Sequence, residues 1–456
     1  MGRKWFIVAC AAIFCVGSTI QFVTTGSTAI ALLYAGRILG GIGVGASSAV
    51  VPIYLAEVSP AEIRGSLVGI YEVGIQAGTT IGFWIIYAVK QTMPTGTMQW
   101  RFPMAFQLIP GGMLLIGMLF MPESPRWVAL NRSHDEAERL LTKIRGLDAS
   151  HPYIRWEMSR ITEQIAQLKG AHADEFAHHA PRRTFLSLYA ECFSPALRNR
   201  MFTGIVLMIA FQMSGTNAIN YYSPSIFKSL GFQGTSSQFL ATGIYGIVRF
   251  VCILIAMLFV ADRVGRRTLI MIGSVGMAFC MWYIGAFLTA TGGNNEHTKS
   301  GYSAIVFVYV YAACFCFSFA GIPWIYCSEI FPTNIRAHAT SITAATHWLF
   351  NLMLARSVPY MLSGIGGSTF FVFAACLTAS FFWAFFCMPE TRGLSLEDIE
   401  RLWNEPGKAT KFYYFGAHQQ KVLPRLEPNA EVAVLGSGSC DQASTTGSDE
   451  KEKAEL

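Results

Sequence analysis

The sequence predicts an all-α membrane protein built from two repeated helix bundles. Of its 456 residues, 52% are hydrophobic and only 14% are charged, and long apolar runs recur along the chain. A bilayer core of about 30 Å needs roughly 20 apolar residues of helix, and lipid leaves no backbone group unpaired. Short charged motifs also recur in both halves at nearly one separation. Helices that cross a membrane, arranged as a repeat, are therefore expected.

Ten apolar runs have the length of membrane helices, with ends placed to within a few residues. They are residues 5–24, 31–56, 67–89, 102–121, 201–222, 239–260, 268–290, 302–327, 339–362 and 368–388. A rival interpretation makes residues 1–17 a signal peptide, because two basic residues precede an apolar stretch. It is the weaker one, because the apolar run continues to Val23 and no small-residue cleavage site closes it.

Lys and Arg are concentrated in alternate loops, which indicates the orientation of the helices. The basic loops are residues 2–4, 57–66, 122–200, 261–267 and 328–338. We expect these loops and both termini to be cytoplasmic. The predicted organisation is a bundle of about four helices in 1–121, a cytoplasmic helical loop in 122–200, a six-helix bundle in 201–403 and a disordered tail in 404–456. Within the loop, residues 155–168 could form a surface helix with paired charges.

Several classes of function are disfavoured by composition. The net charge of +6 forms no basic stripe with interleaved aromatic residues, so no nucleic-acid partner is expected. The eleven cysteines lie mostly inside apolar runs, without the spacing of a disulfide framework or a metal site. No nucleophile–base pair is evident outside the membrane runs. We therefore expect no metal, no cofactor and no enzymatic activity.

An internal repeat is the strongest organising feature. Three motif pairs match: AEVSPAEIRG with SEIFPTNIRA, PES with PET, and GR with GR. Their offsets are 329 − 57 = 272, 389 − 122 = 267 and 265 − 2 = 263. Parallel repeats of this kind are typical of secondary transporters. The second half places two helices before its basic turn and the first half none, so two helices, about 60 residues, are expected to be missing from the N-terminus.

The ordered motifs carry a family resemblance over most of the chain. They are GRK at 2–4, YAGRILGGIGVG at 34–45, PIYLAEVSPAEIRG at 52–65, PESPRW at 122–127, DRVGRR at 262–267, GIPWIYCSEIFPTNIRA at 321–337 and PETRGLSLEDI at 389–399. The chain resembles the sugar-porter branch of the major facilitator superfamily. Residues 82–93, 99–118 and 211–231 look most similar to fungal quinate-permease-like and hexose transporters. The resemblance implies an alternating-access carrier with twelve helices in complete members.

Charged residues at predicted cytoplasmic helix ends are candidates for a gate. They are Glu57, Arg64, Glu123, Arg126, Asp262, Arg266, Arg267, Glu329 and Arg336. The resemblance implies that such pairs latch the two halves in an outward-facing state. The alternative is that they only set topology or cap helices, since an exposed ion pair is worth about 0–1 kcal/mol.

The solute site is expected near the midplane, where the halves face each other. Gln212, Asn217, Asn220 and Tyr221 carry amides and a phenol that suit a solute with several hydroxyls. The resemblance assigns three of them, Gln212, Asn217 and Tyr221, to sugar contacts, and adds Trp324 and Asn351. Aromatic packing for the Trp and an interhelical hydrogen bond for the Asn remain alternatives.

Departures from the family pattern add further candidates. Glu72 stands where a Gln is usual, and His347 stands where Asn or Gln is common; Phe211 replaces the first Gln of a pair. A carboxylate at membrane depth must be protonated or paired, so Glu72 is a candidate for solute binding or proton transfer. Arg249 could meet a substrate carboxylate or Glu72 itself, or reach to the interface. His347 could titrate near neutral pH or be structural.

Arg37 matches the family position that pairs with a carboxylate in the first helix of proton-coupled members. We expect that helix to be absent here, so Glu72 is the substitute candidate for proton coupling. Gly215 and Gly321 are expected to permit helix bending and close approach rather than binding.

The resulting hypothesis is a secondary carrier, proton symport included, for a small polyhydroxylated solute, either a hexose-like sugar or a quinate-like hydroxy acid. Its partners would be that solute, protons and the bilayer, and its location the plasma membrane. Two alternatives stay open, a non-transporting nutrient sensor and an inactive fragment of a carrier.

Overall fold

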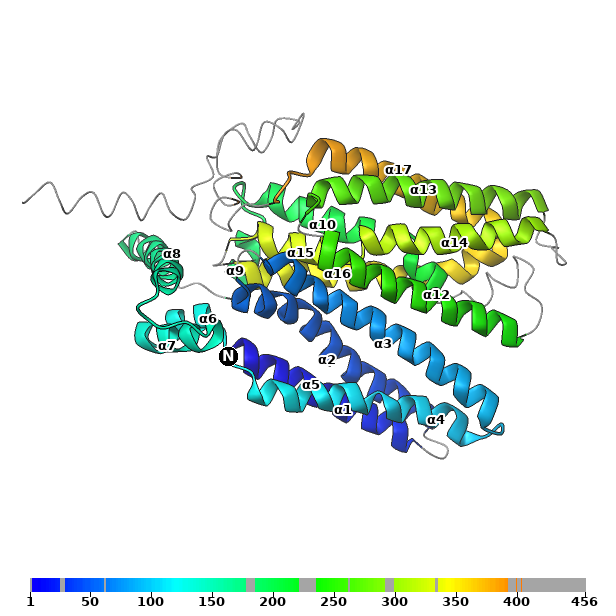
Figure 1. Ribbon diagram of the computed structural model, residues 1–456, viewed down its shortest axis with the longest axis horizontal. Coiled ribbons are helices and arrows are strands. Elements are labelled where there is room, and N and C mark those ends of the chain that lie inside the picture. Colours follow the sequence, from blue (N-terminus) through cyan, green and yellow to red (C-terminus); the bar gives the residue numbers. More distant parts are fainter. Residues whose placement is uncertain are drawn as a thin grey trace, which may run out of the picture. The chain divides into compact units, whose positions relative to one another are not determined.

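The computed structural model describes residues 2–24, 29–60, 63–177, 185–220, 235–260, 263–291, 299–332 and 335–392, with 399 and 403. All of them belong to one compact unit, Met1–Lys411. The expected disordered tail, 404–456, lies outside the described residues. Figure 1 shows that the described elements are helices.

The first half consists of helices that follow the predicted runs closely. They are α1 (Arg3–Val23), α2 (Ala29–Val58), α3 (Arg64–Thr92), α4 (Thr97–Phe106) and α5 (Leu108–Phe120). α1 packs against both α2 and α5 (Figure 1). A Cβ added to Gly17 would lie 2.6 Å from the Gly40 nitrogen, so glycine is required where α1 and α2 cross.

The second half contains more helices, some of them interrupted. They are α10 (Arg198–Met213), α12 (Thr235–Ile255), η2 (Ala256–Val260), α13 (Arg266–Thr291), α14 (Lys299–Phe317), α15 (Ile322–Ile330), α16 (Arg336–Ile365), η3 (Gly366–Ser368) and α17 (Thr369–Cys387). α13 packs against α14 and α17, and α10 packs against α16. A large buried apolar core runs through this half.

Eight segments of the described chain are long and apolar enough to cross a membrane. One of these, Arg336–Cys387, contains both α16 and α17. α3 is also of membrane-crossing length, at 29 residues, and carries the polar residues Glu72 and Gln76. With α16 and α17 counted separately, the membrane-crossing segments among the described residues match nine of the ten predicted runs, and α3 matches the tenth by its length.

Shorter helices connect the two halves. They are α6 (Pro125–Asn131), α7 (His134–Arg145), α8 (Pro152–Ala177) and α9 (Phe185–Glu191). α7 begins where Ser133 Oγ accepts a hydrogen bond from Glu136 N at 3.2 Å and ends at Gly146, whose φ of +66° suits glycine. α6, α7 and α8 share a small apolar core. The surface helix predicted in 155–168 is confirmed as part of α8.

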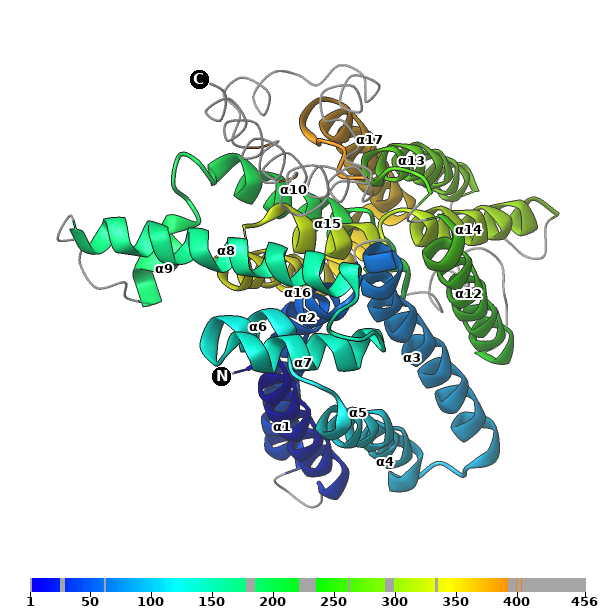
Figure 2. The same cartoon turned by 60° about the vertical axis from the view of Figure 1, so that its left-hand side comes forward.

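The two halves meet mainly where α3 packs against α12 and α2 packs against α16 (Figure 2), and α15 also contacts α2 and α3. Ser66 Oγ donates to Met257 O at 2.9 Å, and Thr80 Oγ1 donates to Gly246 O at 2.9 Å. On the other pair, Trp348 Nε1 donates to Ser48 Oγ at 3.0 Å. These contacts bring the polar residues of α3 against the second half.

The helix that carries Gln212 is broken at Gly215. α10 ends at Met213, Gly215 has φ +87°, and helix resumes over residues 216–220. A second break separates α14 from α15 near Gly321. Interrupted helices at mid-membrane are a recurring feature of transporter binding sites, because they turn side chains toward a cavity. The bending expected at Gly215 is observed.

Gly215→Ala is expected to destabilise the protein. A side chain at φ +87° is strained by about 1–3 kcal/mol, and the added Cβ would lie 2.9 Å from Phe373 Cγ. The matched control is Gly112→Ala in α5, where no atom lies within 4 Å of the added Cβ. Apparent Tm in detergent should fall for the first variant and not for the control, where alanine favours the helix by about 0.5–1 kcal/mol. Equal Tm values for the two variants would contradict the predicted backbone strain at position 215.

Candidate functional site

A chain of three polar side chains crosses the second half between α10 and α16. Gln212 Nε2 lies 3.0 Å from His347 Nε2, and Asn217 Nδ2 donates to Gln212 Oε1 at 2.7 Å. Gln212 and His347 are buried and Asn217 is half-buried. Two residues that resemblance assigned to the solute site, Gln212 and Asn217, are thus joined to His347, a departure from the family pattern.

Aromatic rings extend this polar chain to the first half. The Trp324 ring centre lies 5.0 Å from that of His347 and 5.7 Å from that of Tyr71, which belongs to α3. The Phe211 ring also packs against the imidazole, with 4.7 Å between ring centres. The cluster therefore combines amides, an imidazole and flat apolar faces from both halves, which suits a small polyhydroxylated ring.

Two buried charges lie on the facing helices α3 and α12. Glu72 and Arg249 are each 3% exposed. Gln76 Nε2 donates to Glu72 Oε1 at 2.6 Å, and Arg249 Nη1 donates to Asn220 Oδ1. The two charges are near enough to interact electrostatically, although no ion pair within 4.0 Å joins them in the described structure. Each half thus contributes one buried charge of opposite sign.

The Arg249 guanidinium is held in a position that leaves hydrogen-bonding capacity. Its Cζ lies 5.0 Å from the Phe315 ring centre and 5.7 Å from that of Tyr245. Its Nε is buried without a hydrogen-bond partner in the described part of the chain. The alternative that Arg249 reaches to the membrane interface does not fit this burial. A buried guanidinium with an unused N–H can accommodate an anion.

The structure gives less information on the other predicted site residues. Tyr221 lies outside the described residues. Asn351 is half-buried in α16, one helical turn beyond His347. Arg37 is exposed on α2, and none of the described contacts joins it to Glu72. Sequence reasoning did not single out Gln76, although its position four residues after Glu72 places both on one helix face.

A cavity of about 790 Å³ lies between the halves. It is lined chiefly by α1, α2 and α16, and extends from Arg3 to Trp348, the residue after His347. Small residues such as Gly45, Ala49 and Ala344 line it, with Ser341 among the polar residues. Its volume is that of a small-molecule site.

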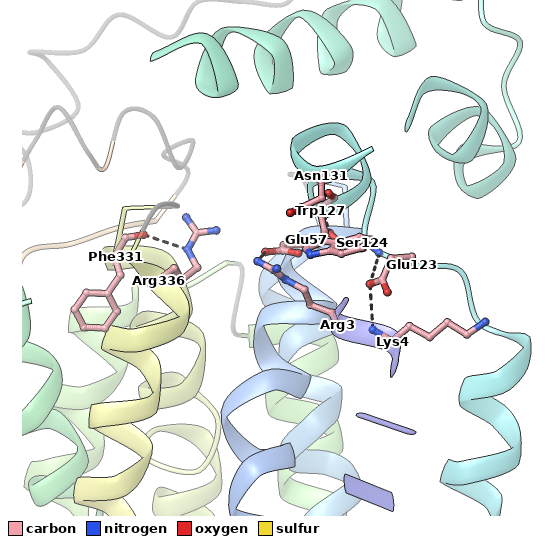
Figure 3. Close-up of polar contacts among 9 residues, drawn as sticks. All are labelled: Arg3, Lys4, Glu57, Glu123, Ser124, Trp127, Asn131, Phe331 and Arg336. Carbon is pink, nitrogen blue, oxygen red and sulfur yellow. Dashed lines mark hydrogen bonds and ion pairs between the residues drawn. The ribbon is translucent and has the colours of Figure 1, made fainter. Parts of the chain in front are cut away.

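A charged network joins three helix ends in the first half (Figure 3). Arg3 Nη2 pairs with Glu57 Oε1 at 3.1 Å, and Ser124 Oγ donates to Glu57 Oε2 at 2.5 Å. Glu123 accepts from the backbone of Lys4 at 3.1 Å and of Ser124 at 3.0 Å. The three motifs of the first half are therefore joined in a ring: Arg3 contacts Glu57, Glu57 contacts Ser124, and Glu123 contacts the backbone of Lys4.

The second half repeats this network with the corresponding residues. Arg266 Nη2 pairs with Glu329 Oε1 at 3.3 Å, and Thr391 Oγ1 donates to Glu329 Oε2 at 3.1 Å. Glu390 accepts from the backbone of Arg266 at 2.7 Å and of Arg267 at 3.1 Å. The repeat found in the sequence is thus also a repeat of hydrogen bonds.

Two of the ion pairs in the described part of the chain involve gate candidates, Arg3–Glu57 and Arg266–Glu329, and each of them joins segments within a single half. Arg336 Nε donates to Phe331 O at 3.1 Å (Figure 3), and Arg126 is half-buried in α6. Asp262 lies outside the described residues, as does the side chain of Arg64. A latch between the two halves stays a prediction.

The sequence pattern of the family described as "Sugar (and other) transporter" matches residues 1–403. The chain belongs to this sugar transporter family. It is an integral membrane protein with the major facilitator fold, and a transporter rather than an enzyme, as the sequence predicted.

Relatives of this chain agree with the family assignment. It is 39% identical over 405 residues to a probable quinate permease of Aspergillus clavatus, covering 88% of the chain and 74% of the relative. It is 36% identical over 456 residues to a quinate permease of Emericella nidulans, covering 98% and 82%. The predicted similarity to fungal quinate permeases is confirmed.

Two solved structures share the fold of this chain. The proton:xylose symporter XylE bound to 6-bromo-6-deoxy-D-glucose matches with a TM-score of 0.73 and 26% identity, over 88% of this chain and 83% of that one. The inward-open xylose transporter XylE from E. coli matches with a TM-score of 0.62 and 26% identity, over 88% and 83%.

Proposed function

We propose that this member of the sugar transporter family carries a quinate-like hydroxy acid together with a proton. The observation that carries the proposal is Arg249, a buried cation that donates to the Asn220 amide and whose Nε has no hydrogen-bond partner in the described part of the chain. A guanidinium binds a carboxylate with two parallel hydrogen bonds, which a neutral sugar cannot use. The relatives named quinate permeases support the same class of solute.

The remaining groups of the cluster suit the hydroxylated ring of such an acid. Gln212, Asn217 and Asn351 would bind hydroxyls, and Trp324 would pack against the ring. A hexose is the second candidate, because these amides and the Trp do not depend on a carboxylate, and XylE is described as a xylose symporter.

Glu72 is the proposed proton carrier. It is buried, accepts a hydrogen bond from Gln76 and interacts electrostatically with Arg249. An anionic solute that pairs with Arg249 would remove the charge that stabilises the Glu72 carboxylate, so protonation of Glu72 would accompany binding. Solute and proton would then travel together. Arg37 remains a weaker candidate for coupling, because it is exposed on α2.

Transport would proceed by alternating access between the bundles 1–121 and 201–403. The helical loop 122–200 and both termini would lie in the cytoplasm, and the protein in the plasma membrane. The two charged networks support this, because each locks the helix ends of one bundle into a unit that can move as a body. The contacts that break and form during transport would then be those between the two bundles.

The proton role predicts a specific change in Glu72→Gln. In proteoliposomes with an inward proton gradient, the unaltered chain should accumulate labelled quinate above the outside concentration. Glu72→Gln should lose this accumulation yet retain quinate exchange without a gradient, because a neutral side chain no longer binds and releases the proton.

The matched control is Glu163→Gln in α8, which removes an exposed carboxylate outside the site. It should accumulate quinate as the unaltered chain does. Gradient-driven accumulation by Glu72→Gln equal to that of the control at every pH would remove Glu72 from the mechanism.

A further inference from the structure

The polar chain through the solute site has a direction that its hydrogen bonds determine. The Gln212 Nε2 nitrogen lies 3.0 Å from His347 Nε2, while Gln212 Oε1 accepts from Asn217 at 2.7 Å. An amide NH₂ donates and cannot accept, so His347 Nε2 must accept from Gln212. The imidazole is then neutral and carries its proton on Nδ1.

That Nδ1–H is a buried donor without an acceptor. His347 is 6% exposed, and its Nδ1 atom has no hydrogen-bond partner in the described part of the chain. The neighbouring rings of Phe211, Trp324 and Trp348, with centres at 4.7, 5.0 and 5.6 Å, provide no oxygen or nitrogen lone pair in the right place. An unsatisfied buried donor destabilises the empty site and gains an acceptor when a solute enters.

We propose that His347 sets the hydrogen-bonding polarity of the solute site, orienting both amides and donating its Nδ1–H to an oxygen of the bound solute. At the opposite end of the chain, the half-buried Asn217 uses its Nδ2 on Gln212, which directs its Oδ1 away from Gln212 as an acceptor. The site thus offers a donor at one end and an acceptor at the other. This inference rests on the proposed function, because it requires the solute to occupy this cluster.

A histidine performs this task differently from the amide that is common at the position. An Asn or Gln can turn over and exchange its donor and acceptor at little cost, whereas a neutral imidazole fixes one of each on separate atoms. If the chain ran the other way, Gln212 Oε1 would accept from His347 Nε2–H, and Nδ1 would be an acceptor. The two arrangements differ in the location of one proton.

The location of that proton can be measured without any solute. We would record ¹⁵N NMR spectra of the full chain with labelled histidine in lipid nanodiscs and assign His347 by difference from His347→Asn. The expected spectrum shows a protonated Nδ1 and a non-protonated Nε2. A protonated Nε2, alone or together with Nδ1, would overturn the proposed polarity, whether or not the chain transports quinate.

The donation to solute is tested by two substitutions with opposite geometry. An Asn amide can reach the place of Nδ1, and a Gln amide can reach the place of Nε2, so only His347→Asn retains the donor to the solute. With quinate as the probe, we expect one deoxy analogue to bind ~10-fold more weakly than quinate to the unaltered chain and to His347→Asn. His347→Gln should bind that analogue and quinate equally.

Equal sensitivity of all three proteins to every deoxy analogue would overturn the donation to solute. D-glucose and its deoxy analogues serve as a second set of probes if quinate does not bind. If neither set binds to protein with an intact spectrum, the proposed function fails, while the tautomer measurement still decides the polarity of the chain.

Discussion

Arg249→Leu is expected to lower kcat/KM for quinate uptake by ~10- to 150-fold. A hydrogen bond to a charged group contributes about 1.5–3 kcal/mol, and each 1.4 kcal/mol is a factor of ten. Arg249 is a buried cation whose Nε has no hydrogen-bond partner among the described residues, and leucine cannot bind a carboxylate. D-glucose uptake, if present, should fall far less, because a neutral sugar brings no carboxylate. Initial rates of labelled uptake in proteoliposomes measure both.

Two control variants separate the site effect from loss of a membrane arginine. Arg356→Leu removes an exposed arginine of α16, which lies 4.9 Å from the Tyr360 ring centre, and should retain quinate uptake. Arg249→Lys keeps the charge but loses the planar fork, so its uptake should lie between those of the unaltered chain and Arg249→Leu. Equal retention of quinate and glucose uptake by Arg249→Leu would exclude the carboxylate role.

Glu329→Gln is expected to destabilise the fold more than the equivalent change in the first half, Glu57→Gln. Removing one partner of a buried ion pair costs about 3–5 kcal/mol, because the other charge remains buried. Arg266 is only 7% exposed in its side chain, whereas Arg3 is 25% exposed and can be solvated. Apparent Tm in detergent measures the difference.

The two positions act as matched controls for each other, because each glutamate also accepts from a hydroxyl, Thr391 or Ser124. The variant at Glu329 should therefore show the larger fall in Tm. Equal falls would mean that burial of the arginine does not determine the effect. No fall in either variant would mean that the networks do not stabilise the bundles.

The membrane helices were predictable because their physical signal is local. An apolar run of about 20 residues predicts a membrane helix wherever it lies. The repeat was predictable for a similar reason, since Glu57 and Glu329 occur in matching motifs at a nearly constant offset. The sequence did not show that the repeated residues form equivalent ion pairs, Arg3–Glu57 in the first half and Arg266–Glu329 in the second; the structure shows this.

The sequence indicated which residues are candidates for the site, but not which of them contact one another. Glu72 and Arg249 stood out because charges inside apolar runs are rare. The spacing of four residues could have indicated Gln76 as a partner of Glu72, but nothing in the sequence indicates that Asn220 binds Arg249. The bond between Gln212 and His347 joins residues 135 positions apart, and a contact of that kind depends on how α10 and α16 pack. Helix breaks such as that between α4 and α5 at Gln107 were likewise not anticipated.

Solute counterflow by the purified chain tests the central claim most directly. Proteoliposomes loaded with unlabelled quinate are diluted into a trace of labelled quinate, and entry of label is followed without any ion gradient. A carrier with one quinate site that faces each side in turn should take up label transiently above its outside concentration, and Arg249→Leu should not. Absence of counterflow with quinate, by protein that Tm shows to be folded, would contradict the account.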